Sequence, residues 1–159
     1  MVEEQSDNTL KTGIDVPKTL NEMLSICHDC SRFHESATKK VQDKHLSKCM
    51  AQMGPVWLET IVVLEPHIKV RNEEPTRTGT VAGTIWQAIA ILEAKLGSGE
   101  EGEILLEHYL DTENEALQVM RDIAEKDALA DPVRSIVQER IEAHETAHAK
   151  LKVLAEEML

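Results

Sequence analysis

The sequence predicts one all-α domain built as a bundle of helices, and its length, composition and hydrophobic spacing support that prediction. The chain has 159 residues, which is a usual size for one domain. Its 42% hydrophobic residues are enough to build a core, and only seven Gly and five Pro interrupt the chain. That balance favours long helices over a β fold with many turns.

We expect residues 1–16 to form a flexible N-terminal arm, because they carry no helical period, and residues 17–159 to form the bundle. A first helix is predicted over residues 17–41, where Pro17 suits the first turn. Side chains suited to a core recur along it at spacings of three and four, which places them on one face. This stripe consists of Leu20, Leu24, Cys27, Cys30, His34, Ala37 and Val41.

A second helix is predicted over residues 43–70, and a tight turn should pair it with the first as an antiparallel hairpin. Gly54 and Pro55 predict a kink or a break, because proline removes a backbone donor and clashes one turn back. Pro66 predicts a bend or the end of the helix. Trp57 is expected to be a packing anchor. The seam consists of Leu46, Met50, Met53, Trp57, Thr60, Leu64 and His67.

Three more helices are predicted, over residues 80–96, over residues 101–126 and from residue 131 onwards. Asp131 and Pro132 predict an N-cap followed by proline at the first helical position. The stripes of the first two are Val81, Ile85, Ile89 and Leu92, then Leu105, Tyr109, Thr112, Ala116, Val119 and Ile123. The last helix has an unbroken heptad seam. It consists of Val137, Ile141, His144, His148, Leu151, Ala155 and Met158.

The order of these helices predicts how the chain is connected. The last two long helices should form a second antiparallel hairpin, and residues 71–100 lie between the two hairpins. A 17-residue helix within that segment spans roughly 25 Å, enough to carry the chain from one end of a bundle to the other. Two hairpins joined by one long crossover are typical of ferritin-like folds. The sequence therefore predicts a ferritin-like four-helix bundle with a short extra helix in its crossover.

Several short stretches resemble a family of small bacterial ferritin-like proteins of unknown function. These stretches are residues 19–24, residues 79–83, the region of Glu113 and residues 143–145, so the resemblance covers most of the chain after the arm. The family often has histidine in the crossover helix where this chain has Trp86, so no role of that histidine carries over. The resemblance implies a fold and leaves room for a metal site, but it implies no established activity.

Cysteine and histidine side chains on two predicted helices form the main candidate metal site. Cys27, Cys30 and His34 recur at i, i+3 and i+7, so one helix face presents two thiols and an imidazole. His144 and His148 occupy consecutive seam positions of the last helix. Thiolate with imidazole suits zinc or copper. In the alternative, the cysteines are small buried hydrophobes and the two histidines form a hydrogen-bonded polar layer.

Two glutamates complete the candidate ligand set. The turns between the predicted helices place Glu59 and Glu113 about level with His144, so Glu113 is a candidate ligand or a partner of that imidazole. Di-iron bundles carry a Glu on each of two helices and Glu-x-x-His on the other two. This chain has only one such motif, from Glu145 to His148, so we do not expect a complete di-iron site.

Charge and cysteine content restrict the partners and the compartment. A formal net charge of −12 disfavours nucleic acid and anionic membrane surfaces as partners. No apolar run approaches the roughly 20 residues of a membrane span, and the first residues do not resemble a secretory signal. The three cysteines fit a reducing compartment better than a disulfide framework. We therefore expect a cytoplasmic protein.

Two functions remain open on the sequence alone. The first is a non-catalytic bundle, acting as a stress-related or interaction protein and forming a homodimer. Its partner surface is expected at an apolar strip on the crossover helix that includes Trp86 and Ile89. The alternative is a metal-binding bundle that holds zinc, copper or iron with histidine, glutamate and cysteine ligands. No motif predicts a catalytic group or an organic cofactor.

Overall fold

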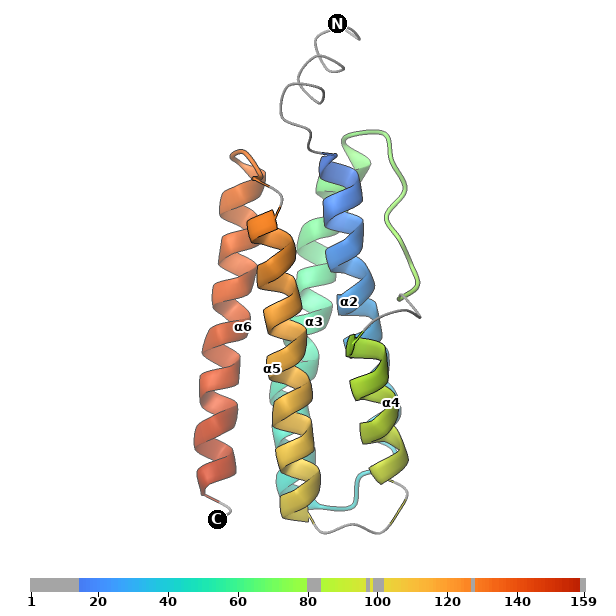
Figure 1. The fold of residues 1–159 in the computed structure, drawn as a ribbon, viewed down its shortest axis with the longest axis vertical. Coiled ribbons are helices and arrows are strands. Elements are labelled where there is room, and N and C mark those ends of the chain that lie inside the picture. Colours follow the sequence, from blue (N-terminus) through green and yellow to red (C-terminus); the bar gives the residue numbers. More distant parts are fainter. Residues whose placement is uncertain (1–14, 80–83, 97, 99–101, 127, 158–159) are drawn as a thin grey trace, which may run out of the picture.

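The computed structural model describes residues 15–79, 84–96, 98, 102–126 and 128–157 (Figure 1). Those residues form five α-helices and no strand, which confirms the all-α prediction for the described part of the chain. Most of the predicted arm, residues 1–14, lies outside the described residues. The helices are α2 (Val16–Ala37), α3 (Lys44–Lys69), α4 (Thr84–Leu96), α5 (Gly102–Lys126) and α6 (Val133–Glu156).

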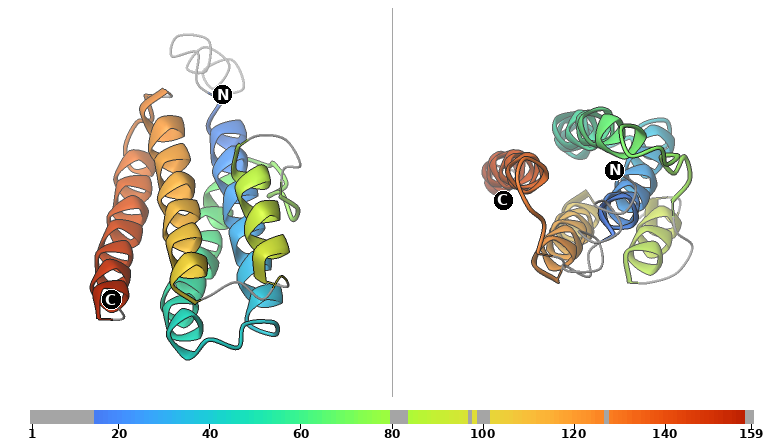
Figure 2. Two further views of the ribbon diagram at one scale, coloured as in Figure 1. Left: turned by 60° about the horizontal axis from the view of Figure 1, so that its bottom comes forward. Right: turned by 90° about the horizontal axis from the view of Figure 1, so that it is seen from above.

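The helices run up and down the long axis of the molecule. In the view of Figure 1, α2 descends, α3 rises, α4 descends, α5 rises and α6 descends. Seen from above, α2, α3, α6 and α5 surround one axis, and α4 lies outside them against α2 and α5 (Figure 2). The four long helices therefore form a bundle made of two antiparallel hairpins, and α4 covers one of its edges.

The connector at residues 70–79 follows the outer side of α2 from the upper end of α3 (Figure 1). Asn21 on α2 holds it: its amide nitrogen donates to a connector carbonyl at 3.2 Å, and its oxygen accepts from the backbone N–H of Thr76 at 2.8 Å. Gly79 lies so close to Asp29 of α2 that a Cβ atom would overlap the carboxylate. Glycine is therefore required where the connector approaches α2.

α3 continues through both of its prolines, so the break considered at Gly54 and Pro55 does not occur. Each proline leaves the carbonyl four residues earlier without its helical hydrogen bond. Pro55 and Pro66 lie on the exposed side of α3, as do Ala51 and Val62, whose carbonyls lose those partners. Because this side faces solvent, water can satisfy the carbonyls, while the buried side chains on the other side keep the helix in place.

Two other helix limits differ from the prediction. The first helix ends at Ala37 instead of residue 41, because residues 38–40 form a turn. α6 begins at Val133, with Pro132 at the N-cap position instead of the first helical position. Asp131 nevertheless caps this end, since its carboxylate accepts a backbone N–H from the first turn of α6 at 3.2 Å.

Apart from His67, which is half-buried, the described positions of the predicted stripes on the long helices face one shared core, and Met158 lies outside the described residues. That core also contains imidazoles: His34 is 4% exposed, His144 1% and His148 7%. On α4, Ile89 is 3% exposed and belongs to the core, whereas Trp86 is 43% exposed. The expectation of Ile89 in an exposed apolar strip is therefore wrong. Among the described helices, none combines the length and hydrophobicity needed to cross a membrane.

Candidate functional site

Buried polar side chains from all four long helices meet inside the bundle. They form two sets, one around a carboxylate and one around a hydroxyl. The carboxylate cluster consists of His34, Trp57, Tyr109 and Glu113. The hydroxyl cluster consists of Thr60, Arg140 and His144. Each residue in the two clusters is at most 9% exposed, so each polar group depends on partners inside the protein.

The carboxylate cluster is built around Glu113 on α5. One carboxylate oxygen lies 3.1 Å from Nε2 of His34 on α2, and the other accepts the Trp57 Nε1–H from α3 at 3.0 Å. The Tyr109 hydroxyl lies 2.6 Å from His34 Nε2 and also hydrogen-bonds to Glu113. His34 Nδ1 donates to the Cys30 carbonyl at 2.6 Å. Both carboxylate oxygens and both imidazole nitrogens therefore have partners.

These contacts determine the charge of His34. Burial alone would lower its pKa, but the Glu113 charge, its hydrogen bond and the Cys30 carbonyl outweigh burial, so the pKa of His34 is raised. Burial and the same carboxylate raise the pKa of Tyr109 well above its usual value, so the phenol keeps its proton. The contact with Glu113 thus favours the charged form of His34 in the interior.

The hydroxyl cluster is built around Thr60 on α3. Its hydroxyl donates to the Val56 carbonyl at 2.9 Å and accepts from Arg140 Nε at 3.1 Å. His144 Nε2 lies 2.9 Å from the same oxygen. Because the single hydroxyl proton goes to Val56, Nε2 must carry the imidazole proton and donate it. His144 Nδ1 then carries a lone pair.

His144 lies in a setting opposite to that of His34. Burial, together with the nearby Arg140 charge, lowers the pKa of His144 to about 4, although Glu113 acts in the other direction. The Trp57 ring stacks obliquely on this imidazole, with the ring centroids 4.2 Å apart. Burial also lowers the pKa of His148, one turn further along α6. Both α6 imidazoles are therefore neutral near pH 7.

Three buried nitrogen atoms on α6 have no hydrogen-bond partner among the described residues. They are Nη2 of Arg140, Nδ1 of His144 and Nε2 of His148, on three successive turns of one helix face. Unpaired buried polar atoms are uncommon, because each costs the protein its lost hydration. This face of α6 is therefore the part of the interior where polar groups are least satisfied.

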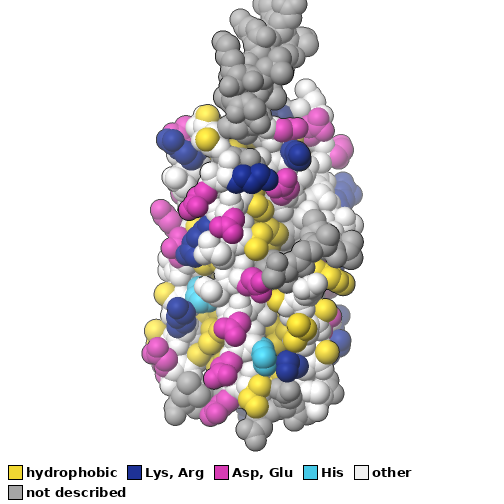
Figure 3. Space-filling view, in the orientation of Figure 1, with side chains coloured by type: hydrophobic (Ala, Val, Ile, Leu, Met, Phe, Trp, Pro, Cys, Tyr) yellow, Lys and Arg dark blue, Asp and Glu magenta, His cyan; other side chains and the backbone are white. Residues whose placement is uncertain are grey.

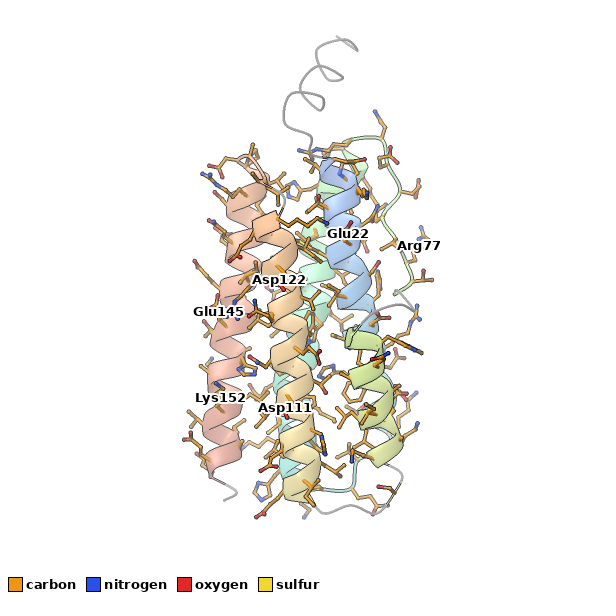
Figure 4. All side chains as sticks on the ribbon, viewed as in Figure 1. Glu22, Arg77, Asp111, Asp122, Glu145 and Lys152 are labelled. Carbon is orange, nitrogen blue, oxygen red and sulfur yellow. The ribbon has the colours of Figure 1, made fainter. Side chains whose placement is uncertain are left out.

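The structure brings together only some of the predicted metal ligands. His34 and Glu113 are in contact, but Glu59 is 64% exposed and lies on the surface, 3.3 Å from Nη1 of Arg140. Glu145 of the Glu-x-x-His motif also lies on the surface of α6 and pairs with Arg121 at 3.2 Å (Figure 4). In the described part of the chain, no group of three or more His, Cys, Asp or Glu could hold a metal ion.

The cysteines of α2 are buried thiols. Burial raises the pKa of Cys27 to about 12, although Arg140 acts in the opposite direction. Burial and the Glu113 charge raise the pKa of Cys30 well above its usual value. A thiol binds metal as a thiolate, so both residues would first have to lose a proton against these effects. All three cysteines, including Cys49, are unpaired.

Sequence reasoning missed four residues of the two clusters. Trp57, Tyr109 and Thr60 were identified as seam positions, but not as hydrogen-bonding groups. Each can donate or accept, and a polar group at a seam position needs an internal partner, so this signal was present. Arg140 gave no such signal, because it directly precedes a seam position and its long side chain reaches Thr60 from there.

Comparison with known proteins gives a family but no activity. No curated protein and no solved structure matches the chain. The sequence model of one family matches residues 15–126, which include α2 to α5 and end before α6. The chain belongs to that family, which is described as a domain of unknown function, DUF2383.

Proposed function

We propose that this protein is a non-catalytic ferritin-like bundle that acts as an interaction protein, and that its interior polar groups stabilise the fold. Two antiparallel hairpins, with the chain passing from the upper end of α3 to the lower end of α5 between them, support the ferritin-like assignment (Figure 1). A second copy of the chain is the first partner to consider, because most soluble oligomers are homo-oligomers.

The engagement of Glu113 carries this proposal. A carboxylate that serves a di-iron centre keeps its oxygens for the metal, whereas both Glu113 oxygens are held by Trp57 and His34. On α3, Trp57 and Thr60 are three residues apart, where a di-iron bundle would carry Glu-x-x-His. These side chains bind to one another and offer no carboxylate or imidazole pair to a metal.

A structural role suits such a buried ion pair. Its attraction roughly offsets the cost of removing both charges from water, so its effect is mainly to favour one arrangement of the helices over others. Here the contacts join α2, α3 and α5, and Thr60 joins α3 to α6. We infer that the two clusters fix the register of all four long helices.

Elemental analysis tests this proposal. We expect untagged protein, purified without chelator, to contain far less than one atom of zinc, copper or iron per chain. Reconstitution with each metal under reducing conditions should leave that content unchanged after desalting. Retention of one metal atom per chain would overturn the proposal.

Metal binding is the second candidate function, and one observation favours it. His144 Nδ1 and His148 Nε2 lie one turn apart, have no partner among the described residues, and belong to neutral imidazoles, the form that binds metal. Zinc, copper or iron would suit such ligands, with Glu113 near enough to influence both imidazoles.

A double variant separates this second candidate from the first. If the α6 imidazoles bind metal, His144→Ala with His148→Ala should abolish retention, while a surface control, His45→Ala, should keep it. Metal retained equally by both variants would exclude the α6 imidazoles as ligands.

A further inference from the structure

The outer side of α3 carries a row of side chains that no described helix covers. This row, called the α3 stripe, consists of Lys48, Ala51, Pro55, Leu58, Val62 and Glu65. Leu58 is 55% exposed and Val62 69%, and Ala51 and Pro55 are also exposed. In the view from above, α3 forms one edge of the bundle and its outer side is free of other helices (Figure 2).

We propose that two copies of this chain bind each other through the α3 stripe, with the two α3 helices antiparallel across a two-fold axis. This inference rests on the proposed function, because it names the partner and the surface of the interaction protein. The spacing, symmetry and charge of the stripe support this pairing.

The spacing of the stripe is that of a helix-pairing seam. Its members follow one another at intervals of three, four, three, four and three residues. This is the spacing by which two helices pack side by side at a crossing angle of about 20°. At 100° per residue, the stripe points away from the buried seam of α3, so one helix can use both faces.

The stripe is also symmetric about its centre, as a two-fold contact between identical helices requires. Positions 48 and 65, 51 and 62, and 55 and 58 are equally far from the midpoint between residues 56 and 57. In an antiparallel pair centred there, Leu58 of one copy meets Pro55 of the other and Val62 meets Ala51, and the free carbonyls of Ala51 and Val62 keep water at the margin of this narrow contact. Each large side chain thus faces a smaller one, which lets the helices approach closely.

The charged ends of the stripe fit the same register. Lys48 of each copy meets Glu65 of the other, so the pair gains two matched contacts between opposite charges. Glu65 already lies 4.0 Å from Lys69 within its own helix, an exposed pair that is easily exchanged. Lys44 of one copy and Lys69 of the other would face each other one turn further out. Helices that cross at about 20° have begun to diverge there, so these like charges stay apart.

The overall charge makes the α3 stripe a favourable place for two copies to meet. The chain has a formal net charge of −12, so most approaches of two copies are opposed by repulsion. Acidic side chains are spread over the face on the α5 side, where Asp111 and Asp122 lie (Figures 3 and 4). The stripe instead pairs one lysine with one glutamate around an apolar centre. Repulsion along the stripe itself is therefore low.

The size of the contact predicts its strength. From residue 48 to residue 65 the stripe is about 26 Å long, and a single helix pair of that length lies at the small end of specific interfaces. We therefore expect a reversible dimer with a Kd on the order of micromolar. The mass measured by light scattering or sedimentation should rise from monomer to dimer across that range.

Three glutamate substitutions at equally exposed positions identify the face. Leu58→Glu on α3 should shift the dimer Kd upward by at least about tenfold, because it places two carboxylates at the centre of the contact. Ile91→Glu on α4 and Val153→Glu on α6 alter side chains that are 55% and 56% exposed, as against 55% for Leu58. These two controls should dimerise like the wild type.

Charge exchange tests the register. Lys48→Glu or Glu65→Lys alone should weaken the dimer several-fold, because each creates two like-charge contacts. The double variant carries both changes and restores opposite charges across the axis, so its Kd should return towards the wild-type value. A double variant that is weaker than either single variant would overturn the register.

Cross-linking tests the geometry directly. The variant Ala51→Cys with Val62→Cys should form intermolecular disulfides on mild oxidation, since the register brings position 51 of one copy opposite position 62 of the other. Either single variant should stay uncross-linked, because its two copies of that position lie about 16 Å apart. The natural cysteines are buried, so they do not compete.

Each outcome decides something different. A wild-type chain that stays monomeric well above micromolar concentrations overturns the α3 dimer. A dimer that Leu58→Glu leaves intact, or that Ile91→Glu or Val153→Glu disrupts equally, overturns the choice of face. Neither result bears on the metal content of the protein. Elemental analysis alone tests whether the buried polar groups have a structural role.

Discussion

Two buried histidines at the centre of this bundle, His34 and His144, have pKa values shifted in opposite directions although both are almost fully enclosed. His34 lies against a carboxylate, and its pKa is raised. His144 lies against a hydroxyl with a guanidinium nearby, and its pKa is lowered to about 4. Burial acts to lower the pKa of both imidazoles, and only at His34 do a carboxylate and its hydrogen bonds outweigh it.

The two surroundings also differ in how completely they are satisfied. In the carboxylate cluster, every nitrogen of His34 and both oxygens of Glu113 have partners. Around the hydroxyl cluster, Arg140 and His144 each keep one nitrogen without a partner among the described residues. We infer that the carboxylate cluster contributes more to stability, and that the α6 side is where a bound ion or molecule would change the protein most.

The largest expected effect comes from removing the carboxylate. Glu113→Leu leaves the His34 nitrogen and the Trp57 N–H buried without their partner. Breaking a buried pair by removing one member costs about 3–5 kcal/mol in unfolding free energy. Urea unfolding followed by circular dichroism measures this loss.

A double-variant cycle shows whether the pair itself is responsible. His34→Leu combined with Glu113→Leu should be less destabilised than the sum of the two single variants, because no unpaired charge remains. If Glu113→Leu cost less than about 1 kcal/mol, the two clusters would not differ as described.

Sequence patterns predicted the helices and their inward faces because periodicity reflects burial directly. The α3 seam is buried from Leu46 to Leu64, and the α6 seam from Val137 to Ala155, including His144 and His148, whereas His67 is only half-buried. The effect of Pro55 was not predictable in the same way, since a proline interrupts a helix less when it lies on the solvent side. That side follows from packing with the other helices, which no local pattern contains.

The candidate site was predictable only as a set of buried polar positions. Spacing placed Glu113 and His144 at similar levels, but it gave no information on rotamers. Thus it did not show that Glu113 turns towards His34 and Trp57. For the same reason it left the direction of Glu59 open, and the structure has this side chain on the surface.

An intermediate effect is expected from pH, because the two histidines respond with opposite signs. The folded pKa of His144 lies near 4 and the unfolded value near 6.5, so the unfolded chain binds more protons between them. Stability from this residue is therefore present above pH 6.5 and is lost as the pH falls to 4, by about 3 kcal/mol. The raised pKa of His34 has the reverse consequence: its contribution is present below 6.5 and is lost as the pH rises through the folded pKa.

Comparison of the wild type with His144→Gln isolates this effect from the titration of surface carboxylates. The unfolding free energy of the wild type should fall more steeply between pH 6.5 and 4 than that of the variant. NMR titration of the imidazoles gives an independent check, with His34 protonated to a higher pH than His144. Equal pKa values for the two residues would remove the basis of the comparison.

The smallest of these effects should come from Thr60→Val, which keeps the shape of the side chain and removes only its hydroxyl. His144 Nε2 and Arg140 Nε both lose their partner at Thr60, so the hydroxyl cluster loses its centre. Leaving buried donors unpaired costs about 1–3 kcal/mol in unfolding free energy, less than the loss expected at Glu113 because no ion pair is broken. Thr112→Val on α5 is a matched control, since that residue is also buried and, among the described residues, its hydroxyl donates to the carbonyl one turn earlier and to no other side chain. If the two threonine variants were equally stable, the Thr60 hydroxyl would contribute no more than an ordinary buried threonine, and its role in joining α3 to α6 would be wrong.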